Sequence, residues 1–187
     1  MTSIVAISGS LRRASFNTAL ARTAAAAAPE GSSLEVATLH GIPLYDGDAE
    51  AASGLPPAVV ELKARVVAAQ GLLLVSPEYN GSIPGVLKNA IDWLSRPPAD
   101  LARVFGGLPV GIIGATPGPA GTRLAQTAWL PVLRQLGCVP YFGKSVFLAA
   151  ASTAFDDTGT LVDAKLRELV RGYVEGFVAF ARAHGRG

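Results

Sequence analysis

The chain has 187 residues, of which half are hydrophobic and 16% are charged, and its formal net charge is +2. This composition is typical of one globular domain with a sizeable core, so we expect a single domain over residues 1–187. The small net charge argues against a dedicated nucleic-acid-binding protein. Cys138 is the only cysteine, which excludes an internal disulfide and a multi-cysteine metal site.

The sequence gives no sign of export or membrane insertion. No basic segment precedes the short apolar run Ile4–Ile7, so we expect no signal peptide. No apolar segment is long enough to span a bilayer. His40 and His184 lie far apart in the sequence, and we expect no metal site and no histidine-based catalysis. The expectation is a cytoplasmic protein without membrane or nucleic-acid partners.

Apolar, strand-like runs alternate with helix-like runs along the whole chain. This alternation predicts βαβ units and a mostly parallel sheet. The predicted strands cover about residues 4–8, 34–39, 72–75, 108–115 and 139–148, the last one interrupted near Gly143. The predicted helices cover about residues 17–27, 56–70, 84–95, 122–136 and 163–182.

Some segments carry more specific signals. Residues 40–55 are rich in Gly, Pro and Asp and predict a long loop, and Pro131 should kink or divide the fourth helix. The last helix has one apolar stripe, made by Leu166, Leu169, Val170, Tyr173, Val174, Phe177 and Val178. Five strands with five helices favour an α/β fold, namely a flavodoxin-like doubly wound five-stranded parallel sheet. Its expected strand order is 2-1-3-4-5, with helices on both faces.

Three polar or glycine-rich loops, residues 8–17, 76–82 and 115–121, follow the predicted first, third and fourth strands. Ligands of doubly wound sheets bind beyond the carboxyl ends of the strands, so these loops can converge on one ligand. The first offers phosphate donors, the second an aromatic ring and an amide, and the third a close approach of backbone. A ligand with a phosphate at one end and a flat polar ring at the other fits all three, and FMN is the natural candidate.

The first loop lies between a strand and a helix N-terminus, where free N–H groups and the helix dipole favour an anion. Ser10, Ser15 and Asn17 can donate hydrogen bonds and Arg12 can supply charge. The alternative is an ordinary helix cap beside a solvated arginine. Capping needs only one of these residues, so the four together favour a phosphate site. The loop lacks G-x-G-x-x-G, which disfavours a dinucleotide held in the Rossmann manner.

The other two loops also have ordinary interpretations. Pro77–Asn80 followed by Gly81 is common turn chemistry, in which Glu78 would only face solvent. The third loop taken alone is more often a simple connection. Gly143–Lys144–Ser145 ends like a phosphate-binding P-loop, but Cys138 stands where that motif needs its first glycine. A break within the fifth strand is the better interpretation.

Two of the loops resemble signatures of a known family. Residues 10–17, Ser-Leu-Arg-Arg-Ala-Ser-Phe-Asn, resemble the FMN-phosphate loop of the NADPH-dependent FMN reductase family, which includes chromate and quinone reductases and some azoreductases. Residues 76–96, which begin Ser-Pro-Glu-Tyr-Asn-Gly, are similar to its second signature. Residues 42–46 and 157–161 also resemble the family, so the resemblance covers nearly the whole chain.

The resemblance implies an FMN-binding enzyme, usually a homodimer or homotetramer. It assigns the phosphate and ribityl end of FMN to Ser10, Leu11, Arg12, Arg13, Ala14, Ser15, Phe16 and Asn17. It assigns the isoalloxazine to Pro77, Glu78, Tyr79 and Asn80, largely through backbone groups, and brings Thr116 near the ring. Pro117 and Pro119 depart from the family pattern, which concerns substrate preference more than FMN binding.

The expected function is that of an NAD(P)H-dependent FMN or quinone reductase. NADPH or NADH would pass a hydride to flavin N5, and a quinone-like, azo, chromate or free-flavin acceptor would then be reduced in a ping-pong cycle. We expect no catalytic side chain, because the flavin supplies the chemistry. The alternative is a non-enzymatic electron-transfer or regulatory flavin-binding protein. Flavodoxins are typically strongly acidic, and the slight positive charge disfavours an electron carrier of that kind.

Overall fold

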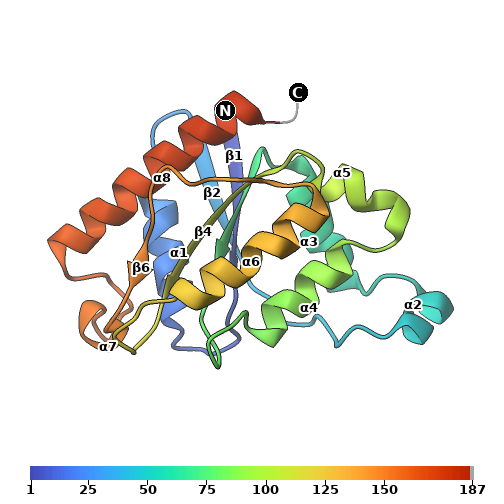
Figure 1. The fold of residues 1–187 in the computed structure, drawn as a ribbon, viewed down its shortest axis with the longest axis horizontal. Helices are drawn as coiled ribbons and strands as arrows, with labels where there is room; N and C mark the ends of the chain where they lie inside the picture. The colour runs from blue at the N-terminus through green and yellow to red at the C-terminus, as the bar shows by residue number, and fades with distance from the viewer. Residues whose placement is uncertain (186–187) are drawn as a thin grey trace.

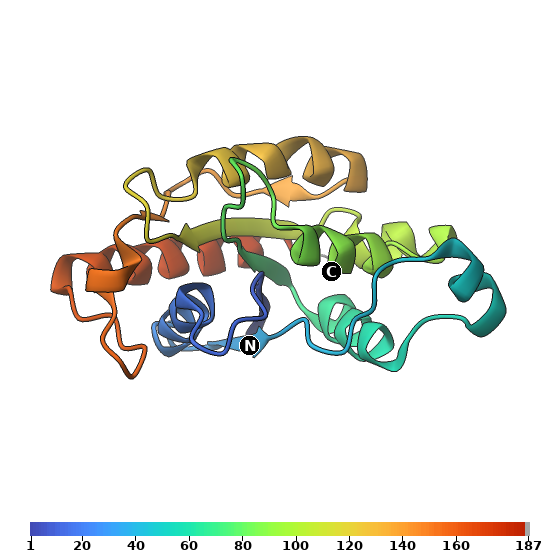
Figure 2. The same ribbon diagram turned by 90° about the horizontal axis from the view of Figure 1, so that it is seen from below.

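The computed structural model describes residues 1–185, which form a parallel sheet with helices on both faces (Figures 1 and 2). The strands are β1 (Thr2–Ser8), β2 (Ser32–Ala37), β3 (Gly71–Val75), β4 (Pro109–Ala115), β5 (Val139–Pro140) and β6 (Phe147–Leu148). The helices are α1 (Phe16–Ala26), α2 (Gly47–Ser53), α3 (Pro57–Ala68), α4 (Gly85–Leu94), α5 (Leu101–Phe105), α6 (Arg123–Leu136), α7 (Ala151–Ala154) and α8 (Ala164–His184). A short 3-10 helix, η1 (Pro98–Asp100), precedes α5.

The strand order is β2-β1-β3-β4-β5, with β6 also paired to β4, and every pair is parallel. This confirms the predicted order. The fifth position of the sheet is divided between two short strands, because β5 pairs with the start of β4 and β6 with its end. Gly143 lies between them, as predicted, and the segment Gly143–Ser145 leads toward a strand rather than a helix.

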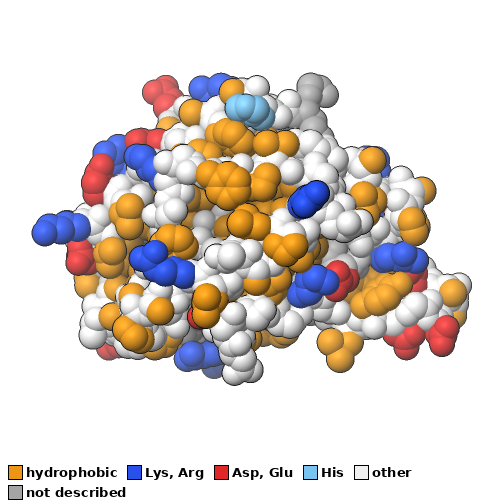
Figure 3. Space-filling model, viewed as in Figure 1, with side chains coloured by type: hydrophobic (Ala, Val, Ile, Leu, Met, Phe, Trp, Pro, Cys, Tyr) orange, Lys and Arg blue, Asp and Glu red, His pale blue; other side chains and the backbone are white. Residues whose placement is uncertain are grey.

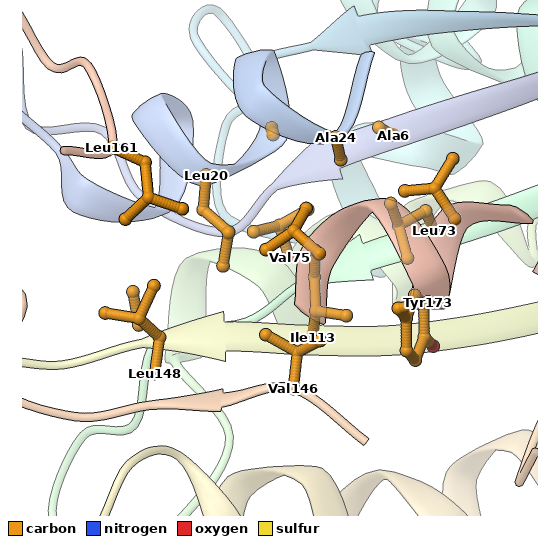
Figure 4. Close-up of a cluster of buried hydrophobic side chains, with 14 of the residues drawn as sticks. Ala6, Leu20, Ala24, Leu73, Val75, Ile113, Val146, Leu148, Leu161 and Tyr173 are labelled. Atoms are coloured by element: carbon orange, nitrogen blue, oxygen red, sulfur yellow. The ribbon is translucent and has the colours of Figure 1, made fainter. Parts of the chain in front are cut away.

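Two apolar clusters hold the layers together, and alternate residues of β1 belong to one or the other. Ile4 and Ala6 pack with α1 and α8, whereas Val5 and Ile7 pack with α3 and α4. Figure 4 shows the first cluster, in which Leu20 of α1 and Tyr173 of α8 meet side chains of the sheet. Each fully buried large apolar side chain contributes about 1.5–3 kcal/mol. Because successive side chains of a strand point to opposite faces of the sheet, a strand buried on both faces contributes to both apolar clusters.

The connection after β2 is more ordered than expected. Residues 40–55 were predicted as a long loop, but they contain α2, so that prediction is wrong. Asp46 caps this helix, because its carboxylate accepts hydrogen bonds from the N–H groups of Asp48 and Ala49. The segment is also tied to α4, since the indole N–H of Trp93 donates to the carbonyl of Pro43 at 2.9 Å. Residues 98–105, which carried no prediction, form η1 and α5.

Two details of the helices differ from the predictions. Pro131 was predicted to kink or divide its helix; it does not divide α6, which runs continuously from Arg123 to Leu136, and the kink stays a prediction. Pro131 is exposed, so water can satisfy the carbonyl that loses its hydrogen bond. Leu169 was placed in the buried stripe of α8 but is 41% exposed, whereas Val170 of the same stripe is buried as predicted. In residues 1–185 no helix combines the length and the apolar character needed to cross a bilayer.

Candidate functional site

The loops after β1, β3 and β4 meet at one end of the sheet, seen at the bottom of Figure 1. They line a small hollow of about 90 Å³ that is open to solvent. The hollow is lined by Ser10, Arg12, Ser15, Phe16, Asn17, Pro77, Glu78, Tyr79, Ala115, Thr116 and Pro117. Nine of the residues that the sequence singled out therefore lie together, although they come from three separate parts of the chain.

The first loop presents two buried hydroxyl groups to this hollow. Ser15 is the N-cap of α1, and its Oγ accepts a hydrogen bond from the N–H of Thr18 at 3.3 Å. Ser10 Oγ accepts from the N–H of Arg12, also at 3.3 Å. Each hydroxyl therefore keeps its own hydrogen available for an acceptor in the hollow. Capping and phosphate binding are compatible here, because Ser15 accepts from the helix and can still donate.

Arg12 adds a cationic group to the same hollow. Its side chain is exposed, and no carboxylate of the described chain pairs with it. Two hydroxyl donors, a guanidinium and a helix N-terminus form a donor set suited to a phosphate group. The residues present therefore fit the phosphate end of FMN.

Asn17 links the first loop to the third. Its amide nitrogen donates to the carbonyl of Ala115 at 2.9 Å, and its amide oxygen accepts from the N–H of Ala115 at 2.9 Å. This pair of hydrogen bonds is buried and fixes the start of α1 against the end of β4. Direct donation from Asn17 to a phosphate remains a prediction, since this arrangement already uses the oxygen and one hydrogen of its amide.

Two glycines let the loops approach one another closely. A Cβ at Gly9 would stand 2.8 Å from side-chain atoms of both Pro77 and Leu87. A Cβ at Gly114 would overlap the carbonyl oxygen of Ser76 and the hydroxyl of Thr122. Neither position tolerates a side chain without movement of its neighbours, so the shape of the hollow depends on both glycines.

The second loop is a tight turn, as the ordinary interpretation of Pro77–Asn80 proposed. Tyr79 and Ser82 exchange two backbone hydrogen bonds, at 3.1 and 3.0 Å. Asn80 and Gly81 between them have φ values of 52° and 72°, which Asn and Gly adopt most readily. Turn chemistry and a binding role coexist, because the turn holds the ring of Tyr79 at the rim of the hollow with 46% of its surface exposed.

Glu78 does not simply face solvent, so that interpretation was wrong. Its carboxylate accepts hydrogen bonds from the backbone N–H groups of Leu124 at 2.9 Å and Ala125 at 3.1 Å. Thr122, the residue in the N-cap position of α6, makes no side-chain capping bond. Glu78 therefore supplies the cap from another loop and stabilises the helix dipole with its negative charge.

We expect Glu78→Ala to lower the free energy of unfolding by about 1 kcal/mol, the usual value of a helix cap. Glu78→Gln keeps an acceptor oxygen and should recover part of this loss. Glu61→Ala removes an exposed glutamate from α3 and serves as the control. Urea denaturation of the three variants measures the effect, and equal loss in Glu78→Ala and Glu61→Ala would contradict the capping role.

The third loop is held by backbone contacts with β6 and α7. The N–H of Thr116 donates to the carbonyl of Leu148, and the carbonyl of Thr116 accepts from Ala151, both at 3.0 Å. The hydroxyl of Thr116 accepts from the N–H of Gly118 at 3.3 Å. Pro117, noted in the sequence only as a departure from a pattern, lines the hollow beside Thr116. Ala115 also lines it; the sequence placed this residue in the third loop but assigned it no role of its own.

Not every residue singled out by the sequence lines the hollow. Leu11, Arg13, Ala14 and Asn80 do not contribute to its wall. Arg13 and Ala14 instead line a neighbouring groove against α1. His40 is exposed, with its Nε2 3.2 Å from the carbonyl oxygen of Leu11. Within residues 1–185 no three His, Cys, Asp or Glu side chains gather as a metal site.

Comparisons with known proteins show which proteins this chain is similar to. The sequence model of the NADPH-dependent FMN reductase family matches residues 2–154. An NAD(P)H-dependent FMN reductase of Pseudomonas aeruginosa is 42% identical over 179 residues, which are 96% of this chain and 95% of that protein. A 2-hydroxy-1,4-benzoquinone reductase from a Burkholderia species is 37% identical over 96% of both chains.

A solved structure extends the likeness to three dimensions. FerB of Paracoccus denitrificans, a flavoenzyme described as an NAD(P)H:(acceptor) oxidoreductase, superposes with a TM-score of 0.86. Its sequence is 32% identical, and the alignment covers 100% of both chains. The two folds therefore agree along the whole of both chains.

Proposed function

Because the chain belongs to the NADPH-dependent FMN reductase family, we propose that it is an NAD(P)H-dependent oxidoreductase that holds FMN between its three loops. The observation that carries the proposal is the convergence of Ser10, Arg12 and Ser15 with Tyr79 and Thr116 on one hollow. The first loop contributes phosphate donors, the second contributes an aromatic side chain, and the third contributes a hydroxyl group. FMN has the matching polarity, with a phosphate at one end and a flat ring at the other.

Ser10, Arg12 and Ser15 would hold the phosphate. The hydroxyl groups of both serines are buried, so hydrogen bonds from them to a dianion are little weakened by competing water. The N-terminus of α1 adds its dipole. Arg13, Leu11 and Ala14 lie in the same loop but outside the wall of the hollow, and side-chain contacts from them are not needed.

Pro77, Glu78 and Tyr79 would flank the isoalloxazine, with Thr116 on the opposite loop. Bound FMN would supply the redox chemistry, namely hydride transfer from NAD(P)H at N5 and reduction of an acceptor in a ping-pong cycle. The protein itself would bind the flavin, orient it and tune its reactivity. Glu78 is suited to this because its charge is directed into the N-terminus of α6 rather than left free beside the ring.

A quinone-like acceptor is the preferred substrate class, ahead of azo compounds, chromate or free flavin. Exposed apolar side chains stand near the hollow, since Tyr79 is 46% and Leu124 60% exposed. Leu124 also lies beside the tight turn, because a Cβ at Gly81 would contact it at 3.4 Å. A flat aromatic acceptor can use such surfaces, whereas an inorganic oxyanion cannot. The benzoquinone reductase named above supports the same class.

Purified protein should be yellow, and acid release followed by mass measurement should identify FMN. NADPH should bleach the bound flavin without any protein partner, and a quinone should restore the colour with steady consumption of NADPH. An electron-transfer protein would not be reduced by NADPH alone, and a regulatory flavin-binding protein would show no turnover. Either of those results would contradict the proposed function.

We expect Arg12→Ala to weaken FMN binding about tenfold, the lower end of what one charge-assisted hydrogen bond supplies. The side chain is exposed and makes no ion pair in the described chain, so stability should not change. Arg134→Ala, at an exposed arginine near the end of α6, is the control. Fluorescence titration of the apoprotein with FMN measures both, and unchanged affinity in Arg12→Ala would count against the phosphate assignment.

We also propose that the protein is a homodimer or homotetramer. Figure 3 shows hydrophobic side chains gathered between α8 and α6, over the segment that joins β5 to β6. Phe142 in this segment is 72% exposed, and Leu44 on the loop before α2 is 82% exposed. Such side chains are more common at subunit contacts than on free surfaces. Light scattering should give a mass of two or four chains, and the mass of one chain would refute the assembly.

A further inference from the structure

A second, larger groove lies beside the hollow, between α1 and the segment around α7. It has a volume of about 410 Å³ and is open to solvent. Arg12, Ser15 and Phe16 line both the groove and the hollow, so the two are continuous across the first loop. Figure 2 views this end of the sheet from below, with α1 beside the loop that follows α7.

Three arginines line this groove: Arg12, Arg13 and Arg22. All three are exposed, and none pairs with a carboxylate in residues 1–185. By contrast, Arg65 and Arg96 each contact a glutamate at 2.8 Å. Arg12 is assigned to the FMN phosphate, so the groove keeps two guanidinium groups, those of Arg13 and Arg22, free to bind a second ligand.

Two carboxylates face the same groove, and they do not neutralise the arginines. Asp156 accepts hydrogen bonds from the hydroxyl and N–H of Thr158 and from the N–H of Thr160, which lower its pKa. Asp156 therefore stabilises the turn formed by the residues that follow it. Asp157 lines the groove without an ion pair in the described chain. Beside Arg13 and Arg22, only Asp157 therefore opposes an incoming anion without being engaged elsewhere.

Apolar and small residues shape the floor of the groove. The rings of Phe16 and Phe155 stack with their centroids 5.9 Å apart. Ala19 and Gly159 stand opposite each other, since a Cβ at Gly159 would lie 3.4 Å from that of Ala19. The groove can thus accept a flat apolar ring as well as a phosphate. A phosphorylated nucleoside combines these two features in one molecule.

We propose that this groove binds the 2′-phosphorylated adenosine half of NADPH, with Arg13 and Arg22 at the 2′-phosphate. The inference rests on the proposed function and goes further, because it makes these arginines the determinants of preference for NADPH over NADH. NADH carries a 2′-hydroxyl where NADPH carries a phosphate, so it leaves both guanidinium groups without their partner. Arginine is the side chain best suited to a phosphate, since its planar fork can donate two hydrogen bonds at once.

The direct test is titration of the FMN-loaded protein with 2′,5′-ADP and with 5′-AMP, followed by calorimetry. Loaded protein is required because its first phosphate site is already filled. We expect 2′,5′-ADP to bind about tenfold more tightly than 5′-AMP, the effect of roughly one charge-assisted hydrogen bond. Arg22→Ala should remove this difference. Equal binding of the two nucleotides to the unaltered protein would overturn the proposal.

Two further variants sharpen the result. Asp157→Asn removes the unengaged opposing charge and should tighten 2′,5′-ADP binding about twofold, as expected for an exposed charge. Arg134→Ala removes an exposed arginine that does not line the groove and should change nothing. If Arg134→Ala weakens binding as much as Arg22→Ala, the effect is one of net charge and the groove is not the site.

Kinetics separate this inference from the function on which it rests. Arg22→Ala should lower kcat/KM for NADPH about tenfold and leave kcat/KM for NADH unchanged. Loss of activity with both nucleotides would contradict a role in discrimination. Full activity with both would overturn the groove assignment while leaving the reductase function intact. A protein without NAD(P)H oxidation would instead refute the proposed function itself.

Discussion

Gly114→Ala should lower the free energy of unfolding by about 3 kcal/mol, the upper part of the usual range for overpacking a core. A Cβ at this position overlaps the carbonyl oxygen of Ser76 and the side chain of Thr122. The first is backbone and the second is fully buried, so neither can move aside at small cost. Thermal and urea denaturation measure the loss.

The same substitution should weaken FMN binding, because Gly114 directly precedes the residues of β4 and its loop that line the hollow. Gly118→Ala is the matched control in the same loop. A Cβ there meets its nearest neighbour, the Thr116 hydroxyl, at an ordinary 3.7 Å. Its unfolding free energy should stay within about 0.5 kcal/mol of the original. Similar stability in the two variants would show that the strands and loops are less tightly packed than described.

Asn17→Ala should lower the free energy of unfolding by about 3 kcal/mol, because it leaves the buried N–H and carbonyl of Ala115 without partners and each costs about 1–3 kcal/mol. Both hydrogen bonds are 2.9 Å long. Their loss also frees the start of α1 from the end of β4, so FMN affinity should fall together with stability. Denaturation and FMN titration of the same variant test both effects.

Asn89→Ala provides a close comparison. Asn89 also uses both atoms of its amide, accepting from the N–H of Tyr45 and donating to the carbonyl of Pro43, each at 2.8 Å. These bonds are exposed, so water can replace them, and the expected loss is about 1 kcal/mol. If both substitutions cost the same, burial would not be the reason for the importance of Asn17.

The repeated alternation of apolar runs predicted the architecture correctly. A fully apolar run such as Leu72–Val75 must lie in the middle of a parallel sheet, and β3 does occupy the central position. The break in the fifth strand near Gly143 could be read because β-strand residues stand on both sides of it. Local propensity did not predict α2. The loop before this helix is held by hydrogen bonds from Asn89 and Trp93, which lie on α4.

By itself, the sequence determined the alternation of strands and helices and the three loops that bear ligand-binding residues, because periodicity and the position of a loop after a strand are local properties. The expected strand order followed from the flavodoxin-like fold that this alternation favoured. Only the tertiary structure decided which polar groups remain free for a ligand. Asn17 finds its partner 98 residues away, Glu78 caps a helix that begins far along the chain, and Arg22 joins a groove with the first loop. Hydrogen-bond partners and shared cavities depend on which distant segments pack together, and no local pattern of residues records that.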